Sequence, residues 1–230
     1  MLYLILAVTT FNSSNEESKC IDIELSIKDS IHGGFISKNE IHSILKAKNL
    51  YPVDKVLANI STNEIEKELH KHPLIDQVEC FKTPSRKIGI EIHQRIPIVR
   101  VLSNKGGFFV DNKREIMPSQ TKCTADLIAV TGNVSKDYAK GDLYDFAVFI
   151  SKDSFWNNQI EQIHVIREDL VEIVPRVGDH IVTIGNLDDY ESKLQRLKIF
   201  YEKVLTQVGW NKYKMINVEF SNQIICTKVN

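Results

Sequence analysis

The stretch from Glu64 to Val101 constrains the fold of this 230-residue chain more than any other part of it. It begins as a short helix that ends at His72–Pro73, because the residue before a proline avoids the helical conformation. Two strands follow on either side of the turn residues Thr83–Lys87, and isoleucines alternate with other residues in the second strand. The pattern predicts an antiparallel hairpin with one solvated face, which runs on through Pro97 into a second unit.

The residues before this hairpin predict a strand and two helices. Cys20–Lys28 alternates apolar and polar residues, as a half-buried strand does. Ser37 precedes Glu40 by three residues, which is the capping-box pattern at the start of a helix. Ser61 or Thr62 caps a second helix. The first unit therefore has the predicted order β-α-α-β-β.

The chain beyond Pro97 is rich in predicted strands and contains one long helix. Apolar residues recur every three or four positions from Leu187 to Val208. Asp188 and Asp189 fall in the predicted first turn and Gly209 just past the last one, as helix ends favour. Because strands follow this helix, we expect it to pack across a sheet rather than to form a coiled coil.

The chain closes with a predicted hairpin around Ser221–Asn222. Apolar residues alternate on its two strands, at Ile216, Val218 and Phe220 on the first and at Ile224 and Cys226 on the second. One face of such a hairpin packs on the long helix, and its outermost strand leaves backbone groups unpaired. We expect a partner strand to complete this edge.

The composition is that of a globular protein without a nucleic-acid-binding surface. The formal net charge is −1, 43% of the residues are hydrophobic and 26% are charged. The four cysteines, Cys20, Cys80, Cys123 and Cys226, are scattered without a CxxC pair. They permit disulfides without indicating them, and they do not match a zinc ribbon.

The N-terminus predicts contact with a membrane. Met1–Phe11 is apolar without interruption, and Asn12–Lys19 is polar. A bilayer span needs about 20 residues, and a secretory signal would carry a basic region and a clear cleavage site. We expect residues 1–19 to be the outer end of a membrane anchor and its spacer; a degenerate signal peptide and a buried strand are the alternatives. The anchor and the signal peptide both place the chain from Cys20 onward outside the cytoplasm.

No sequence pattern predicts an enzyme, a metal site or a cofactor site. The chain has no HExxH, GxSxG, P-loop or GxGxxG motif. His70 and His72 are two residues apart, so they do not share a helix face. His180 follows Asp179 in a predicted turn, where we expect the pair to be solvated. An extracytoplasmic hydrolase would need a clustered nucleophile and base.

The order of these elements resembles the FtsQ/DivIB family of bacterial cell-division proteins, in which a POTRA domain precedes a β domain. The resemblance is carried by the end of the first hairpin and by short motifs in the second unit: Gln94–Val101, Phe108–Asp111, Glu115–Pro118, Leu127–Gly132 and Arg176–Asp179. It implies an α+β fold, with a POTRA domain (β-α-α-β-β) at residues 20–96. A mixed β domain with a long C-terminal helix and a closing hairpin follows at residues 97–230.

The resemblance implies a divisome scaffold without catalytic activity, metal or cofactor. Such a protein is single-pass in the inner membrane, with most of its chain in the periplasm at the division septum. Its POTRA domain receives other division proteins, and its β domain binds FtsB- and FtsL-type proteins by strand addition along the C-terminal edge. The implied partner-binding residues are Glu219, Phe220, Asn222, Gln223 and Ile224.

The partner contact at Glu219, the role of Phe220 and the class of protein each have an alternative. Glu219 stands where many members of the family carry a basic residue. The Phe220 side chain fits a core position as well as a contact with a partner. The competing class is a POTRA-containing envelope protein of outer-membrane assembly or secretion, which would carry tandem POTRA units or a barrel with strands of about ten residues.

We predict that the full-length gene product begins upstream of Met1, with an apolar run and a basic cytoplasmic flank. Fractionation of that product should recover it with the membranes. A soluble product with a processed N-terminus would favour the signal peptide instead.

Overall fold

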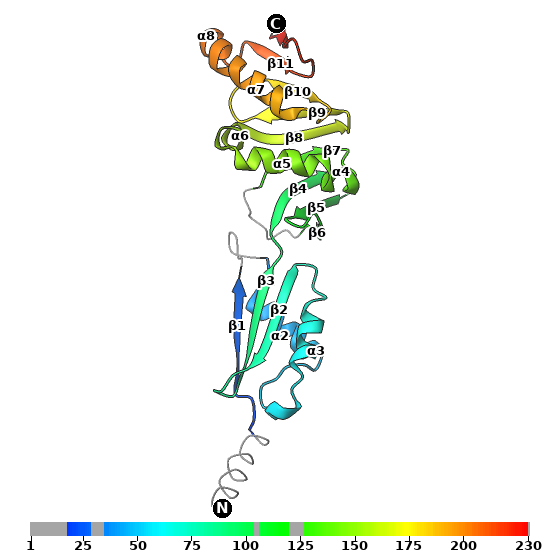
Figure 1. The fold of residues 1–230 in the computed structure, drawn as a ribbon, viewed down its shortest axis with the longest axis vertical. Helices are drawn as coiled ribbons and strands as arrows, with labels where there is room; N and C mark the ends of the chain where they lie inside the picture. The colour runs from blue at the N-terminus through cyan, green and yellow to red at the C-terminus, as the bar shows by residue number, and fades with distance from the viewer. Residues whose placement is uncertain (1–17, 29–34, 104–105, 120–126, 230) are drawn as a thin grey trace, which may run out of the picture. The chain divides into compact units, whose positions relative to one another are not determined.

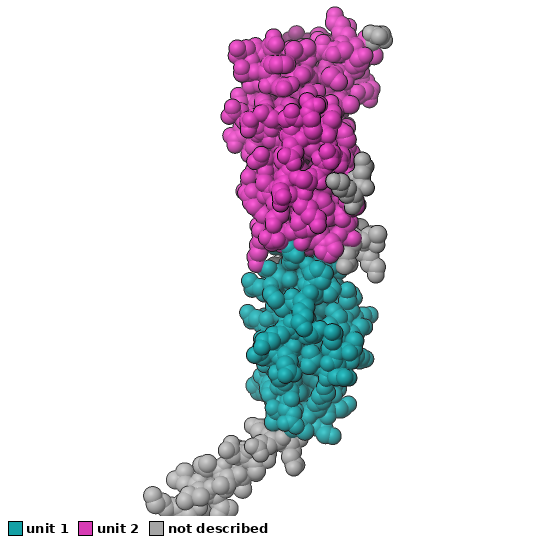
Figure 2. Space-filling view, turned by 90° about the vertical axis from the view of Figure 1, so that its right-hand side faces the viewer, with its two compact units in different colours: residues 1–96, 120–125 teal, residues 97–119, 126–230 magenta. Residues whose placement is uncertain are grey.

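The computed structural model describes residues 18–28, 35–103, 106–119 and 127–229. Backbone contacts divide the chain into two compact units, with the boundary between Ile96 and Pro97 (Figure 2). The expected anchor, most of its spacer and Cys123 lie outside the described residues. In the described part, no helix has both the length and the apolar character to cross a membrane.

The first unit is a three-stranded sheet packed against two helices (Figure 1). Its elements are β1 (Asp22–Lys28), α2 (Lys38–Ala47), the short 3-10 helix η2 (Leu57–Asn59), α3 (Thr62–Leu69), β2 (Ile75–Lys82) and β3 (Lys87–Gln94). Strand β3 lies in the centre, antiparallel to β2 and parallel to β1. The predicted β-α-α-β-β order is therefore confirmed.

Both helices of the first unit begin at the predicted caps. The Ser37 hydroxyl accepts a hydrogen bond from the Glu40 backbone N–H at 3.2 Å. The Ser61 hydroxyl accepts one from the Glu64 backbone N–H at 3.3 Å. Each cap satisfies a donor that has no partner within the first helical turn.

The alternation in β3 determines which face of the sheet the helices cover. Ile88, Ile90 and Ile92 are fully buried on the helical side. On the other face, the Phe81 ring lies directly over Gly89, so that a Cβ atom at this position would collide with the ring. The glycine therefore lets the aromatic side chain cover the open face of the sheet.

The second unit is a sheet of nine described strands with helices in its crossovers. The strand order is β12-β11-β10-β9-β8-β7-β4-β5-β6, in which the pairs β4–β7, β7–β8 and β10–β11 are parallel. The first strands are β4 (Pro97–Ser103), β5 (Gly106–Asp111), β6 (Ile116–Pro118) and β7 (Ala129–Gly132). Helices α4 (Lys136–Lys140), α5 (Asp142–Lys152) and α6 (Ser154–Gln159) lead to β8 (Ile160–Arg167), β9 (Leu170–Pro175) and β10 (Ile181–Gly185). The last crossover contains α7 (Tyr190–Phe200), the π-helical turn η3 (Tyr201–Leu205) and α8 (Thr206–Val208), followed by β11 (Tyr213–Asn217) and β12 (Ile225–Lys228).

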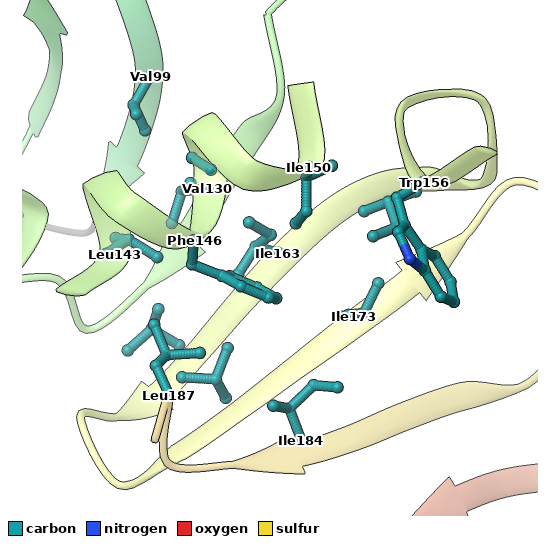
Figure 3. Close-up of a cluster of buried hydrophobic side chains, with 14 of the residues drawn as sticks. Val99, Val130, Leu143, Phe146, Ile150, Trp156, Ile163, Ile173, Ile184 and Leu187 are labelled. Carbon is teal, nitrogen blue, oxygen red and sulfur yellow. The ribbon is translucent and has the colours of Figure 1, made fainter. Parts of the chain in front are cut away.

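The core of the second unit lies between the sheet and these helices. Figure 3 shows Phe146, Ile150 and Trp156 of the helical layer on the side of the sheet that carries Ile163 and Ile173. All five side chains are buried. Burial of apolar surface of this kind is the main favourable contribution to folding.

The long helix begins later than the sequence predicts. It starts at Tyr190, and Asp189 is its N-cap residue in the left-handed conformation, with φ 51°. Asp188 is outside the helix, where its carboxylate accepts a hydrogen bond from the Asn186 side chain at 2.5 Å. The expectation that both aspartates lie in the first turn is therefore wrong, because the left-handed residue interrupts the helical path.

The second half of this helix contains a π-helical turn that the sequence pattern does not predict. Tyr201 and Leu205 are buried, whereas Val204 is half-buried and Val208 is 44% exposed. A π-turn has a wider step than an α-helical turn, so it rotates the residues that follow it. The apolar stripe predicted through Val208 therefore ends at Leu205.

His180 is buried, which corrects the expectation that it is solvated beside Asp179. It has the same side-chain direction along the strand as Val182 and Ile184, which pack against the helices. Its Nε2 atom lies 2.8 Å from the Tyr201 hydroxyl oxygen. Burial lowers the pKa of His180, an effect that the nearby Trp210 carbonyl and Asp179 oppose.

We predict that residues 18–96 fold alone, because this unit has its own core and a proline follows it. The isolated fragment should unfold cooperatively and give a dispersed NMR spectrum. A spectrum typical of a disordered chain would contradict two independent domains.

We also predict that His180 destabilises the second unit in acid. The pKa of a histidine in an unfolded chain is about 6.5, and the pKa of His180 in the folded protein is lower. The unfolded state therefore binds a proton first, and the free energy of unfolding falls as the pH drops below that value. As the pH falls from about 7.5 to about 5.5, the melting temperature of the wild type should fall more than that of His180→Gln. The difference between the two melting temperatures should therefore become smaller. A constant difference would show that His180 does not titrate in this way.

Candidate partner-binding edge

Strand β12 forms one outer edge of the nine-stranded sheet. It is antiparallel to β11, with Cys226 opposite Ile216 and Ile225 opposite Asn217. Among the described residues, no strand pairs with its other side. The outer side of β12 therefore presents backbone groups that a further strand can bind.

The direction of the β12 amides follows from the last hydrogen bond of the hairpin. The Val229 N–H donates to the Lys212 carbonyl at 3.2 Å, so this amide points toward the β11 side. Successive amides of a strand point in opposite directions. The N–H groups of Cys226 and Lys228 therefore point outward, away from β11.

Three of the four outer strands of the two sheets, β2, β6 and β12, differ in how their backbone donors are used. In β2, the Cys80 N–H donates to a Glu66 carboxylate oxygen of α3 at 2.8 Å. Strand β6 ends at Pro118, whose nitrogen carries no hydrogen. Strand β12 contains no proline, and its first residue, Ile225, is 46% exposed. Of these three strands, β12 is the one best suited to accept a partner strand.

The inner face of β12 joins the core through one cysteine. Cys226 is half-buried, and burial raises the pKa of its thiol. Its neighbour on β11, Ile216, is fully buried. The described cysteines, Cys20, Cys80 and Cys226, are free thiols. Cys226 therefore acts here as a small apolar residue that anchors the edge strand.

A seven-residue connection, residues 218–224, joins β11 to β12. The buried Val218 donates its N–H to the Thr183 carbonyl of β10 at 2.9 Å. The Glu219 N–H donates to the Asn217 side-chain oxygen at 2.8 Å. The first two N–H groups after β11 therefore bind a β10 carbonyl and a side-chain oxygen, and neither binds β12.

Arg196 of α7 holds this connection from the helical side. Its guanidinium donates to the Val218 carbonyl at 2.8 Å and to the Phe220 carbonyl at 3.1 Å. It also donates to the Ser192 hydroxyl at 3.1 Å. One side chain thus joins the long helix to the chain segment between the last two strands.

The sequence-predicted partner-binding residues all lie in this connection, and none lies in a strand: Glu219, Phe220, Asn222, Gln223 and Ile224. The predicted strand through Phe220 is wrong, because β11 ends at Asn217. Phe220 is 45% exposed, so it is not a core residue. Ile224 is half-buried, and the other three residues are exposed.

Two hollows lie beside the connection. The first, which we call the apolar hollow, has a volume of about 380 Å³ and is lined by Arg196, Ile199, Phe200, Lys203, Val204 and residues 221–224. The second, the acidic hollow, has a volume of about 530 Å³ and is lined by Asn186, Asp188, Asp189, Ser192, Lys193, Arg196 and residues 219–221. Asn222, Gln223 and Ile224 therefore line the apolar hollow, whereas Glu219 and Phe220 line the acidic one.

Sequence reasoning missed the helical wall of the apolar hollow. Ile199 is 42% exposed, and its neighbour Phe200 also lies outside the predicted stripe. The sequence signal for this wall was the pair of adjacent apolar residues, Ile199 and Phe200, beside the predicted apolar stripe of the long helix. Nothing in the sequence distinguishes Arg196 from the other basic residues of the helix, because its carbonyl partners are more than 20 residues away in the chain.

The acidic hollow contains a buried ammonium group with two internal acceptors. Lys193 is buried, and its Nζ atom donates to the backbone and side-chain oxygens of Asn186, each at 2.8 Å. Burial lowers the pKa of this amine, and the nearby carboxylates oppose the effect, with Asp188 first among them. Lys193 therefore closes the turn between β10 and α7. Among the described residues, no group of three or more His, Cys, Asp or Glu side chains is arranged to hold a metal ion.

Comparisons with known proteins assign both units. The model of the POTRA-like domain matches residues 18–93. The family model described as FtsQ/DivIB, C-terminal related, matches residues 96–227, which include both hollows and β12 except for its last residue. No curated protein matches the chain. The resemblance and the α+β fold expected from it are confirmed, and the chain belongs to the FtsQ/DivIB-related family of non-enzymatic cell-division scaffolds.

Proposed function

We propose that this protein binds FtsB- and FtsL-type division proteins by accepting a strand of a partner along β12. The single observation that carries the proposal is the outer side of β12, with its outward N–H groups at Cys226 and Lys228. A partner strand would satisfy these donors, and the sheet would continue without a break.

The side chains beside this edge support the same proposal. Ile225 and Val229 are about half exposed, at 46% and 54%, and both lie in or next to β12. The apolar hollow adjoins Ile224 at the start of the strand. Main-chain hydrogen bonds give affinity in strand addition, and pockets for side chains give specificity. The edge at β12 has outward N–H groups for the first and an adjoining apolar hollow for the second.

The wider cellular role is part of the proposal. The protein acts in the inner membrane as a single-pass protein, with both units in the periplasm at the division septum. The apolar run at Met1–Phe11 motivates this location. The POTRA-like unit binds other division proteins, so that the scaffold couples early and late steps of division. The match of the second unit to the FtsQ/DivIB-related model favours this role over outer-membrane assembly or secretion.

We predict that Lys228→Pro weakens binding of an FtsB-type partner by about tenfold or more, since it removes an outward donor and leaves a partner carbonyl unpaired. Lys228→Ala is the matched control, because it removes the same side chain but keeps the N–H. Its dissociation constant should stay within about twofold of the wild-type value. Isothermal titration calorimetry on the purified proteins measures both.

Equal binding by the wild type and Lys228→Pro would rule out β12 as the pairing edge. Melting curves of the two variants show whether the second unit keeps its fold. Deletion of residues 225–230 provides a second test that does not depend on proline geometry. The deletion should abolish binding while the POTRA-like unit stays folded.

A further inference from the structure

Strand β1 is an outer strand of the three-stranded sheet, on the side of β3 away from β2 (Figure 1). Among the described residues, no strand of the sheet pairs with its other side. An isolated bridge joins Lys19 to Val56, but it lies before β1 begins. Strand β1 is seven residues long and contains no proline. Its outer side is therefore an edge at which another strand can pair.

The hydrogen bonds of the β2–β3 hairpin show which backbone groups of β1 point outward. The Thr83 N–H donates to the Lys87 carbonyl at 2.9 Å, so the backbone groups of Lys87 face β2. Those of the next residue, Ile88, therefore face β1. In a parallel pair, such a residue bonds to the residues on either side of the one opposite it, which is Ile23. The backbone groups of Ile23, and of every second residue after it, therefore point away from the sheet.

One of these outward donors is covered by a side chain within the single chain. The Ile23 N–H donates to a carboxylate oxygen of Asp22 at 2.8 Å, which agrees with its outward direction. Asp22 is exposed. The N–H groups of Leu25 and Ile27 point the same way, because successive amides of a strand alternate in direction. A pairing strand would provide carbonyl acceptors for all three donors.

The order of side chains along β1 makes the strand complementary to itself. When two copies pair antiparallel with Leu25 opposite Leu25, Ile23 lies opposite Ile27, and Asp22 lies opposite Lys28. Outward backbone groups then meet outward backbone groups along the whole strand. An apolar pair and an oppositely charged pair each stabilise neighbouring strands. The symmetric register therefore satisfies the backbone and the side chains together.

The neighbouring registers are less favourable. A shift of two residues in one direction places Glu24 opposite Glu24, and like charges directly opposite each other are destabilising. A shift of two residues in the other direction leaves Asp22 and Ile23 without an opposite residue in β1. Charge and strand length therefore select the register that is centred on Leu25.

The surroundings of the charged pair favour the same register. Asp22 and Lys28 are exposed, on the face of the sheet opposite the helices. Lys28 forms an ion pair with Glu91 of β3, with 3.1 Å between the ammonium and the carboxylate. In the symmetric register, this ammonium lies between Glu91 of its own chain and Asp22 of the second copy. On the helical side, the half-buried Ile27 gains cover from Ile23 of the second copy.

We propose that two copies of this chain associate through β1, so that their three-stranded sheets join into one sheet of six strands. The pairing is antiparallel and has two-fold symmetry, with Leu25 on the axis. It does not depend on the proposed pairing of a partner strand with β12. Each copy keeps its own β12 edge, so the dimer can hold two partner strands.

Sedimentation equilibrium on the full chain measures this association. An edge of this length buries less surface than a standard interface, so we expect a weak dimer with a dissociation constant of roughly 100 µM. A chain that stays monomeric up to about 1 mM would overturn the proposal.

Two charge-reversed chains test the register. Asp22→Lys places a lysine opposite Lys28, and Lys28→Asp places an aspartate opposite Asp22. Each variant alone should dimerise about fivefold more weakly than the wild type. In an equal mixture, every lysine meets an aspartate, and the mixed dimer should form with an affinity within about twofold of the wild-type value. A mixture as weak as the separate variants would overturn the pairing of Asp22 with Lys28.

A proline variant tests the edge without changing its charges. Ile27→Pro removes an outward donor but no hydrogen bond to β3, and Ile27→Ala is its matched control. We expect Ile27→Pro to dimerise at least about tenfold more weakly than Ile27→Ala, because symmetry doubles the loss. Lys228→Pro should dimerise as the wild type does. Loss of the dimer in Lys228→Pro, with Ile27→Pro unaffected, would place self-association at β12 and overturn the proposal.

Discussion

Backbone hydrogen bonding at the edges of the sheets is the constraint on which this structure depends. A strand inside a sheet has both sides paired, whereas an outer strand must leave its donors to water, a side chain or another chain. Glu66 takes the Cys80 donor of β2, and Pro118 removes a donor from β6. Strand β12 has neither device. The proposed binding of a partner strand is therefore placed at β12, which lies in the unit that matches the FtsQ/DivIB-related model.

The helical layer makes this edge usable. Leu194, Leu197 and Tyr201 fix α7 and its π-turn on the sheet, which sets the position of Arg196 against the last connection. Arg196 in turn binds two carbonyls of the connection that leads into β12. A rigid core thus supports a strand that has one side free, as expected for a site that must bind without unfolding. Cys226 ties the strand to this core from within.

Local sequence patterns predicted most of the fold because they are properties of neighbouring residues. The alternation at Ile88, Ile90 and Ile92 and the caps at Ser37 and Ser61 are of this kind. The failures arise from long-range contacts. His180 is buried because its strand direction places it against Tyr201. The connection after β11 binds Arg196, which is more than 20 residues away in the chain. For the same reason, the predicted binding residues lie in the connection between β11 and β12 rather than in a strand.

Hydrogen exchange at β12, with and without the FtsB-type partner, tests the central claim most directly. The account predicts slower exchange in peptides that cover Ile225–Lys228 when the partner is present, because outward amides gain acceptors. Strand β6 should show no change. Protection of β6 or of the POTRA-like unit, with exchange at β12 unaltered, would contradict pairing of the partner along the C-terminal edge.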